Sequence, residues 1–185
     1  MWRERMRDAL RAVRDGKPYA PPPDDIDEFN EAELATGIGT PLADAAARSD
    51  ALLAEIIALF DELGERPFKW YIAEATTEAV LRNSYTHPRL HMSEYLRENG
   101  ERDRAVGIFE DAVARMRELS APPSILGMVL YNLACLRVDE GLQEEGLALL
   151  EEALTIRPAN RQIARGDKDF ATLHDNPKFK ALVSE

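Results

Sequence analysis

The sequence predicts an all-α fold, and three observations support this class. Apolar residues recur at spacings of three and four along most of the chain, which places them on one face of a helix. Glycines and prolines separate these periodic segments, as is typical of short connections between helices. No segment sustains the apolar–polar alternation and β-branched enrichment of a strand, so we expect no sheet.

Residues 1–85 are expected to form four helices and one long loop. The loop is proline-rich and acidic and spans residues 17–42, because consecutive prolines at 21–23 exclude a regular helix. Thr40 and Pro41 are the start signal of the long helix that follows, as N-cap and first-turn residue. The expected helices cover residues 2–15, a short stretch of the loop at 25–34, then 41–63 and 67–83.

Six helices are expected in residues 86–185. Pro88 suits the first turn of the helix that begins near His87, and Gly100 ends this helix. Near the C-terminus, Asn176 is the expected N-cap of the last helix. The six expected helices cover residues 87–99, 102–118, 125–139, 142–157, 168–173 and 177–183.

An internal repeat relates residues 86–119 to residues 127–160. When Gly100 is aligned with Gly141, small residues of one copy align with small residues of the other, and Phe109 aligns with Leu150. Two antiparallel helices approach closely only where both present short side chains, so the small residues should be buried between helices. The matched small pairs are Ser93 with Ala134, Ala105 with Gly146, and Ala112 with Ala153.

This pattern resembles the tetratricopeptide repeat, a helix–turn–helix unit of about 34 residues. The large aromatic residue early in that repeat is absent from the first copy, where Arg89 stands, and only the second copy has the closing proline, Pro158. Residues 165–183 resemble the segment that caps the stack in many bacterial tetratricopeptide proteins. The residues that match this capping segment are Asp167, Asp169, Phe170, Leu173, Asn176, Pro177, Phe179 and Leu182.

Residues 2–96 resemble a DinB-like helical domain that is truncated at its N-terminus. This resemblance implies that His87 and His91 are metal ligands, and the family's third histidine would precede Met1. The matching residues are Trp2, Met6, Ala9, Leu10, Gly16, Pro21 to Pro23, Ile26, Asp27, Phe29 and Asn30, then Leu42, Ser49, Leu52 and Leu53, and finally Asn83, Ser84, Tyr85, His87 and His91.

Together the two resemblances imply a chain of three parts. Residues 1–85 would be the DinB-like helical region, residues 86–160 the two repeats, and residues 161–185 the capping helices. The expected architecture is therefore antiparallel helical hairpins of tetratricopeptide type stacked on DinB-like bundle helices.

The spacing of His87 and His91 also indicates, by itself, a candidate metal site. On a helix, residues four apart lie on one face about 6 Å from each other, so both imidazoles can share a divalent metal such as zinc or nickel. The alternative is that both rings are simply solvated in the first turn of their helix. A catalytic zinc needs three protein ligands. Glu94 or one of Asp24 to Asp27 could supply a carboxylate as the third, but nothing in the sequence fixes one there. No other cofactor is expected.

Charge and cysteine content limit the partners and the compartment. The net charge of −11 disfavours nucleic acid and anionic membranes. The chain has one cysteine, Cys135, in an apolar run, which predicts a buried side chain and weakly favours a cytoplasmic location. No apolar run approaches the roughly 20 residues that span a bilayer.

In tetratricopeptide stacks, the first helix of each hairpin lines a concave face. The resemblance therefore implies a non-enzymatic module that binds a protein or peptide. Alternatively, Met128 and Tyr131 pack on the capping helices. The groove residues implied besides the two histidines are Leu90, Glu94, Arg97, Met128, Tyr131, Asn132 and Cys135.

Two rival hypotheses remain from the sequence. In one, the chain is a metal-dependent DinB-like small-molecule transferase or hydrolase that uses His87 and His91. In the other, a second copy supplies the missing helices, so that a homodimer completes the site.

Overall fold

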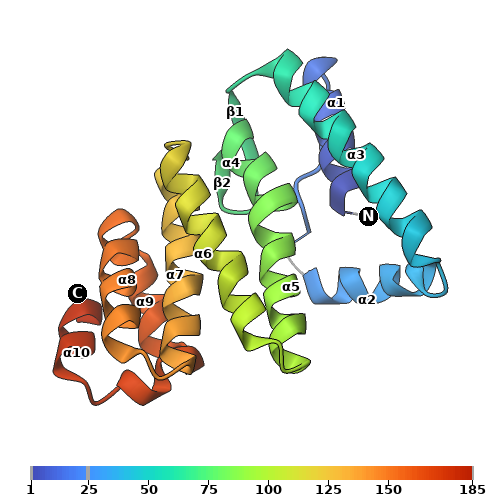
Figure 1. Cartoon of the computed structure of the whole chain (residues 1–185). Helices are drawn as coiled ribbons and strands as arrows, with labels where there is room; N and C mark the ends of the chain where they lie inside the picture. Colours follow the sequence, from blue (N-terminus) through green and yellow to red (C-terminus); the bar gives the residue numbers. More distant parts are fainter. Residues whose placement is uncertain (1, 24–25, 185) are drawn as a thin grey trace. The chain divides into compact units, whose positions relative to one another are not determined.

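The computed structural model describes residues 2–23 and 26–184, and most of these residues are helical (Figure 1). The prediction of the all-α class is confirmed. The chain divides into two compact units, Met1–Tyr85 and Thr86–Glu185, each with its own buried core. No helix of the described segments is long and apolar enough to cross a bilayer.

In the first unit, α1 and α3 pack side by side, with α1 behind α3 in Figure 1. Their apolar stripes meet in the core, where Met6 and Leu10 of α1 are buried with Ile56 and Leu59 of α3. The expected N-cap, Thr40, does not cap α3; the N-cap position is Pro41, without a side-chain hydrogen bond. The helices of this unit are α1 (Trp2–Arg14), α2 (Ile26–Gly37), α3 (Leu42–Leu63) and α4 (Thr76–Leu81), followed by a π-helical turn (Arg82–Thr86).

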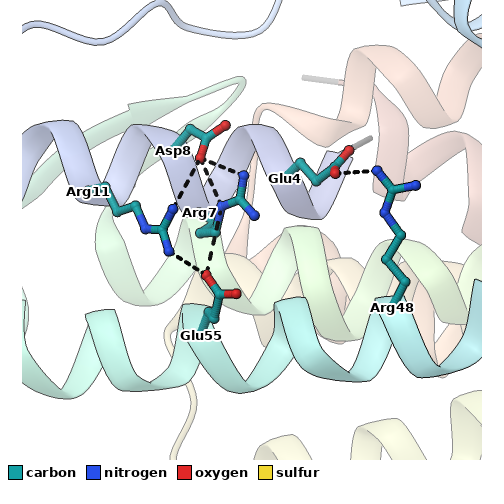
Figure 2. Close-up of polar contacts among 6 residues, drawn as sticks. All are labelled: Glu4, Arg7, Asp8, Arg11, Arg48 and Glu55. Carbon is teal, nitrogen blue, oxygen red and sulfur yellow. Dashed lines mark hydrogen bonds and ion pairs between the residues drawn. The ribbon is translucent and has the colours of Figure 1, made fainter.

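Ion pairs also join α1 to α3 at their exposed edge (Figure 2). Arg11 Nη2 lies 2.7 Å from Glu55 Oε2, and Arg48 of α3 pairs with Glu4 of α1. Exposed ion pairs contribute little to stability, usually below about 1 kcal/mol each. The buried apolar contacts therefore hold the two helices together, and the ion pairs align them.

The predicted helix over 67–83 is wrong in its first half, and so is the expectation of no sheet. Strands β1 (Pro67–Trp70) and β2 (Ala73–Ala75) form an antiparallel hairpin, with Trp70 opposite Ala73. Phe68 and Trp70 alternate into the core, and Tyr71 turns the chain with a left-handed φ of 54°. The described residues contain this one small sheet.

The proline-rich loop completes this hairpin. The Lys69 N–H donates to the Tyr19 hydroxyl oxygen at 2.8 Å, and the Tyr19 O–H donates to the Lys69 carbonyl at 3.1 Å. The Tyr19 ring also stacks on Phe68, with ring centroids 4.7 Å apart. The loop therefore satisfies the backbone of β1 on its outer edge.

The second unit contains two antiparallel helical hairpins and a C-terminal segment. Gly100 and Gly141 make the two hairpin turns, with left-handed φ values of 78° and 81°. The short helix α9 was not predicted. The elements are α5 (His87–Glu98), α6 (Arg102–Glu118), α7 (Pro123–Asp139), α8 (Gln143–Ile156), α9 (Asn160–Gly166), a 3₁₀ helix (Lys168–Leu173) and α10 (Pro177–Val183).

Short side chains allow the helices of each hairpin to approach closely, as the repeat predicts. An added Cβ at Gly146 of α8 would lie 2.5 Å from Val138 Cγ2 and 3.1 Å from the Ala134 carbonyl oxygen of α7. In the first hairpin, the Ser93 hydroxyl donates to the Ala105 carbonyl at 3.2 Å. The matched positions are all buried: Ser93, Ala105, Phe109, Ala112, Ala134, Gly146, Leu150 and Ala153.

Candidate functional site

Two side-chain contacts link the α5 segment to α7, one at Thr86, just before α5 begins, and one near the end of both helices. At the first end, the Thr86 hydroxyl lies 3.5 Å from Met128 Sδ. At the other end, Arg97 Nη2 lies 3.2 Å from Asp139 Oδ2. Both contacts join residues 42 positions apart, close to the offset of 41 that aligns Gly100 with Gly141. These two contacts relate the first helices of the two copies by nearly the offset of the sequence repeat.

The surface between these two contacts holds several of the predicted groove residues. Leu90 of α5 and Asn132 of α7 are half-buried, while Glu94 is exposed. Arg97 is half-buried and is occupied by its ion pair with Asp139. Sequence reasoning missed Asp139; its only signal was the acidic pair Glu98 and Asp139 at equivalent positions of the two copies.

Two predicted groove residues lie under the C-terminal segment instead. The Tyr131 hydroxyl donates to Asp167 Oδ2 at 2.8 Å, and its ring meets Phe170 edge-on, with centroids 5.5 Å apart. Tyr131 and Cys135 are both buried. Tyr131 therefore packs on the capping segment, which is the alternative given for it above. Met128, for which the same alternative was given, contacts Thr86 instead.

Burial also makes the thiol of Cys135 chemically inert. Desolvation raises the pKa of the Cys135 thiol far above its usual range, and the negative charges of Asp167 and Asp169 raise it further. The thiolate is the reactive form of cysteine, so this side chain is not a nucleophile. Burial and the hydrogen bond to Asp167 likewise raise the pKa of Tyr131, which keeps the phenol neutral.

The two histidines of α5 are close together. His87 Nε2 lies 3.2 Å from His91 Nε2, and the rings meet at 75° with centroids 4.5 Å apart. Two nitrogens bound to one tetrahedral zinc at 2.0–2.1 Å would be about 3.3 Å apart. The separation of the two Nε2 atoms therefore already suits a shared metal ion.

Glu94 orients this pair. Its Oε2 lies 3.0 Å from His91 Nδ1, on the side of the ring that faces away from His87. A carboxylate behind a metal-binding histidine fixes the ring and its tautomer. Among the described residues, however, no group of three or more His, Cys, Asp or Glu side chains is placed to hold a metal. Asp24 and Asp25, considered as carboxylate donors, lie outside the described residues.

No protein-family model matches the chain, and neither curated proteins nor solved structures give a significant match. The α5–α7 surface and the histidine pair are two features of the described residues that bear on function.

Proposed function

We propose that this chain is a non-enzymatic module that binds a protein or peptide through tetratricopeptide-like repeats. The observation that carries the proposal is the pair of contacts that link the α5 segment to α7, each between residues 42 positions apart. Repeated hairpins whose first helices lie side by side present one continuous surface, which is how helical repeat proteins bind extended ligands.

The chemistry of the α5–α7 surface suits a peptide. Leu90 offers an apolar contact near the middle of the surface. The side-chain amide of Asn132 makes no hydrogen bond to another described residue, so it can both donate to and accept from a peptide backbone. Glu94 and His91 are exposed on the same helix as Leu90 and add polar contacts.

The proposal predicts that peptides selected from a random display library bind through this surface. Asn132→Ala and Leu90→Ser should each weaken binding of a selected peptide at least about tenfold, because a central contact is lost. Isothermal titration calorimetry measures the change. Arg104→Ala, an exposed position on α6, is the control and should leave the affinity unchanged. Failure to enrich any peptide, or equal losses in the control, would contradict this function.

A second candidate function is favoured by the histidine geometry: a metal-dependent DinB-like transferase or hydrolase of small molecules. The 3.2 Å separation of the two Nε2 atoms and the carboxylate behind His91 support it. His87 and His91 would hold zinc or nickel, and the metal would supply Lewis-acid chemistry. Two protein ligands leave further positions for water, substrate or a group from a second copy of the chain.

Metal titration tests this second function. Zinc or nickel should raise the melting temperature, and the double variant His87→Ala, His91→Ala should abolish the rise. Glu94→Gln should weaken metal binding about tenfold through the orientation of His91. His174→Ala is the matched control. If purified protein retains less than about a tenth of an equivalent of metal and shows no shift, the metal-dependent function is wrong. Light scattering tests the associated homodimer.

A further inference from the structure

A cluster of large apolar side chains is exposed where α2 meets α3. Leu42 is 85% exposed and Ile38 is 73% exposed, more than any other large apolar residue of the described chain, and Leu34 is 61% exposed. Of the ten large apolar side chains that are exposed in the described residues, three therefore lie within nine consecutive positions. Scattered exposed apolar residues are ordinary, but a local cluster indicates a surface that contacts something. We call Leu34, Ile38 and Leu42 the α2–α3 corner.

The first half of α2, the helix that leads to this corner, makes aromatic and polar contacts with α1. Phe29 of α2 packs against Trp2, with ring centroids 5.3 Å apart, and the guanidinium of Arg5 lies 3.9 Å from the Phe29 ring centroid. Asn30 accepts a hydrogen bond from Trp2 Nε1 at 2.9 Å. No residue of α2 is buried, and Figure 1 shows its later half extending away from α1 to the start of α3. The corner thus projects from the core of its own unit.

The charged side chains in the sequence around the corner are all negative. Between Lys17 and Arg48 the sequence contains seven carboxylates and no lysine or arginine. Glu31 of α2 and Asp44 of α3 are exposed within three positions of a corner residue, and Asp27 is exposed about two turns earlier on α2. A second copy of this chain, with a net charge of −11, would be repelled, as would an anionic membrane surface. A positively charged partner would be attracted and oriented by the same field.

We propose that the α2–α3 corner docks a basic amphipathic segment of a partner protein. Apolar side chains of that segment cover Leu34, Ile38 and Leu42, and its lysines or arginines pair with Asp27, Glu31 and Asp44. Both halves of the recognition are needed, since apolar burial supplies affinity and charge selects the partner. This surface belongs to the first unit, whereas the α5–α7 surface belongs to the second.

Two labelled peptides test the proposal on the full chain. One is an amphipathic peptide of leucine and lysine, and the other has glutamate in place of every lysine. Fluorescence anisotropy should show binding of the lysine peptide and none of the glutamate peptide. The double variant Ile38→Ser, Leu42→Ser should weaken binding at least about tenfold, and raising the salt concentration from about 50 to about 500 mM should weaken it as well.

The control variants are Leu119→Ser and Ile163→Ser, whose side chains are 63% and 62% exposed elsewhere in the chain. They remove apolar side chains that are also largely exposed and should not change the affinity. The proposal is overturned if the lysine peptide does not bind, if both peptides bind equally, or if the controls lose as much affinity as the corner variant. A fall in molecular mass on light scattering of the corner variant would also overturn it, because a second copy would then be the occupant.

Discussion

Gly146→Ala should lower the free energy of unfolding by about 1–3 kcal/mol, although alanine is ordinarily the better helix former. The reason is the close approach of α8 to α7, where the new Cβ would lie 2.5 Å from Val138 Cγ2 and 3.1 Å from a backbone oxygen of Ala134. The Ala134 oxygen is a backbone atom and the β-branched Val138 side chain has a single stiff χ1 torsion, so either the helices separate slightly or Val138 leaves its preferred rotamer. Urea unfolding followed by far-UV circular dichroism measures the loss.

Gly107→Ala provides the matched control for this experiment. Gly107 also lies inside a helix, α6, but apart from the glycine itself, its two chain neighbours and the nearby backbone of α6, no atom of the described residues lies within 4 Å of its added Cβ. There the alanine should raise the free energy of unfolding by up to about 1 kcal/mol, because only the helix propensity changes. Opposite signs at the two glycines are expected. A stabilised Gly146→Ala variant would show that α7 and α8 do not depend on a short side chain for their packing.

The helices and their contact positions could be predicted because the signals are local. In α6 and α8, apolar residues at spacings of three and four define the buried face, and a glycine turn separates each helix from its partner. The small residues matched by the repeat, such as Ala105 and Gly146, are buried as expected. These features depend on residues within one hairpin, so the sequence alone specifies them.

The β1–β2 hairpin could not be predicted because its determinants are short or distant. Phe68 and Trp70 alternate over only four residues, and Phe68, Tyr71 and Ile72 fit helical spacing equally well. The partner that satisfies β1 is Tyr19, some 50 positions earlier in the chain. Helix α9 was missed for a related reason, because its apolar face is weak: Ala164 is buried, and Ile163 is exposed.

The candidate site also contains one part that the sequence predicts and one part that it does not. His87 and His91 were expected to lie together because four residues make about one helical turn, and they do. The exposure of Tyr131 and Cys135 depended on where residues 167–170 would pack, some 35 positions further along the chain. Helical periodicity cannot specify such a contact, so the sequence fits both a groove position for Tyr131 and its packing on the capping helices.

Phe170→Ala should have the largest effect of any single substitution in the capping segment. Phe170 is fully buried between Tyr131 and Phe179, with ring centroids 5.5 and 5.7 Å from theirs. Truncating a buried phenylalanine costs about 3–5 kcal/mol, which is a large fraction of the stability of an ordinary domain. The 3₁₀ helix that covers Cys135 should therefore open far more often than in the unmodified protein.

Cys135 reports this opening directly, because it is the one cysteine in the chain and is buried. Its labelling by a thiol reagent should accelerate at least about tenfold in Phe170→Ala, since opening restores both solvent access and an ordinary thiol pKa. Lys168→Ala changes an exposed residue of the same 3₁₀ helix and should leave the labelling rate unchanged. Equal rates in Phe170→Ala and the unmodified protein would mean that α7 and α8 bury Cys135 without help from the capping segment. In that case Phe170 would stabilise the packing of the C-terminal segment but would not shield Cys135 from solvent.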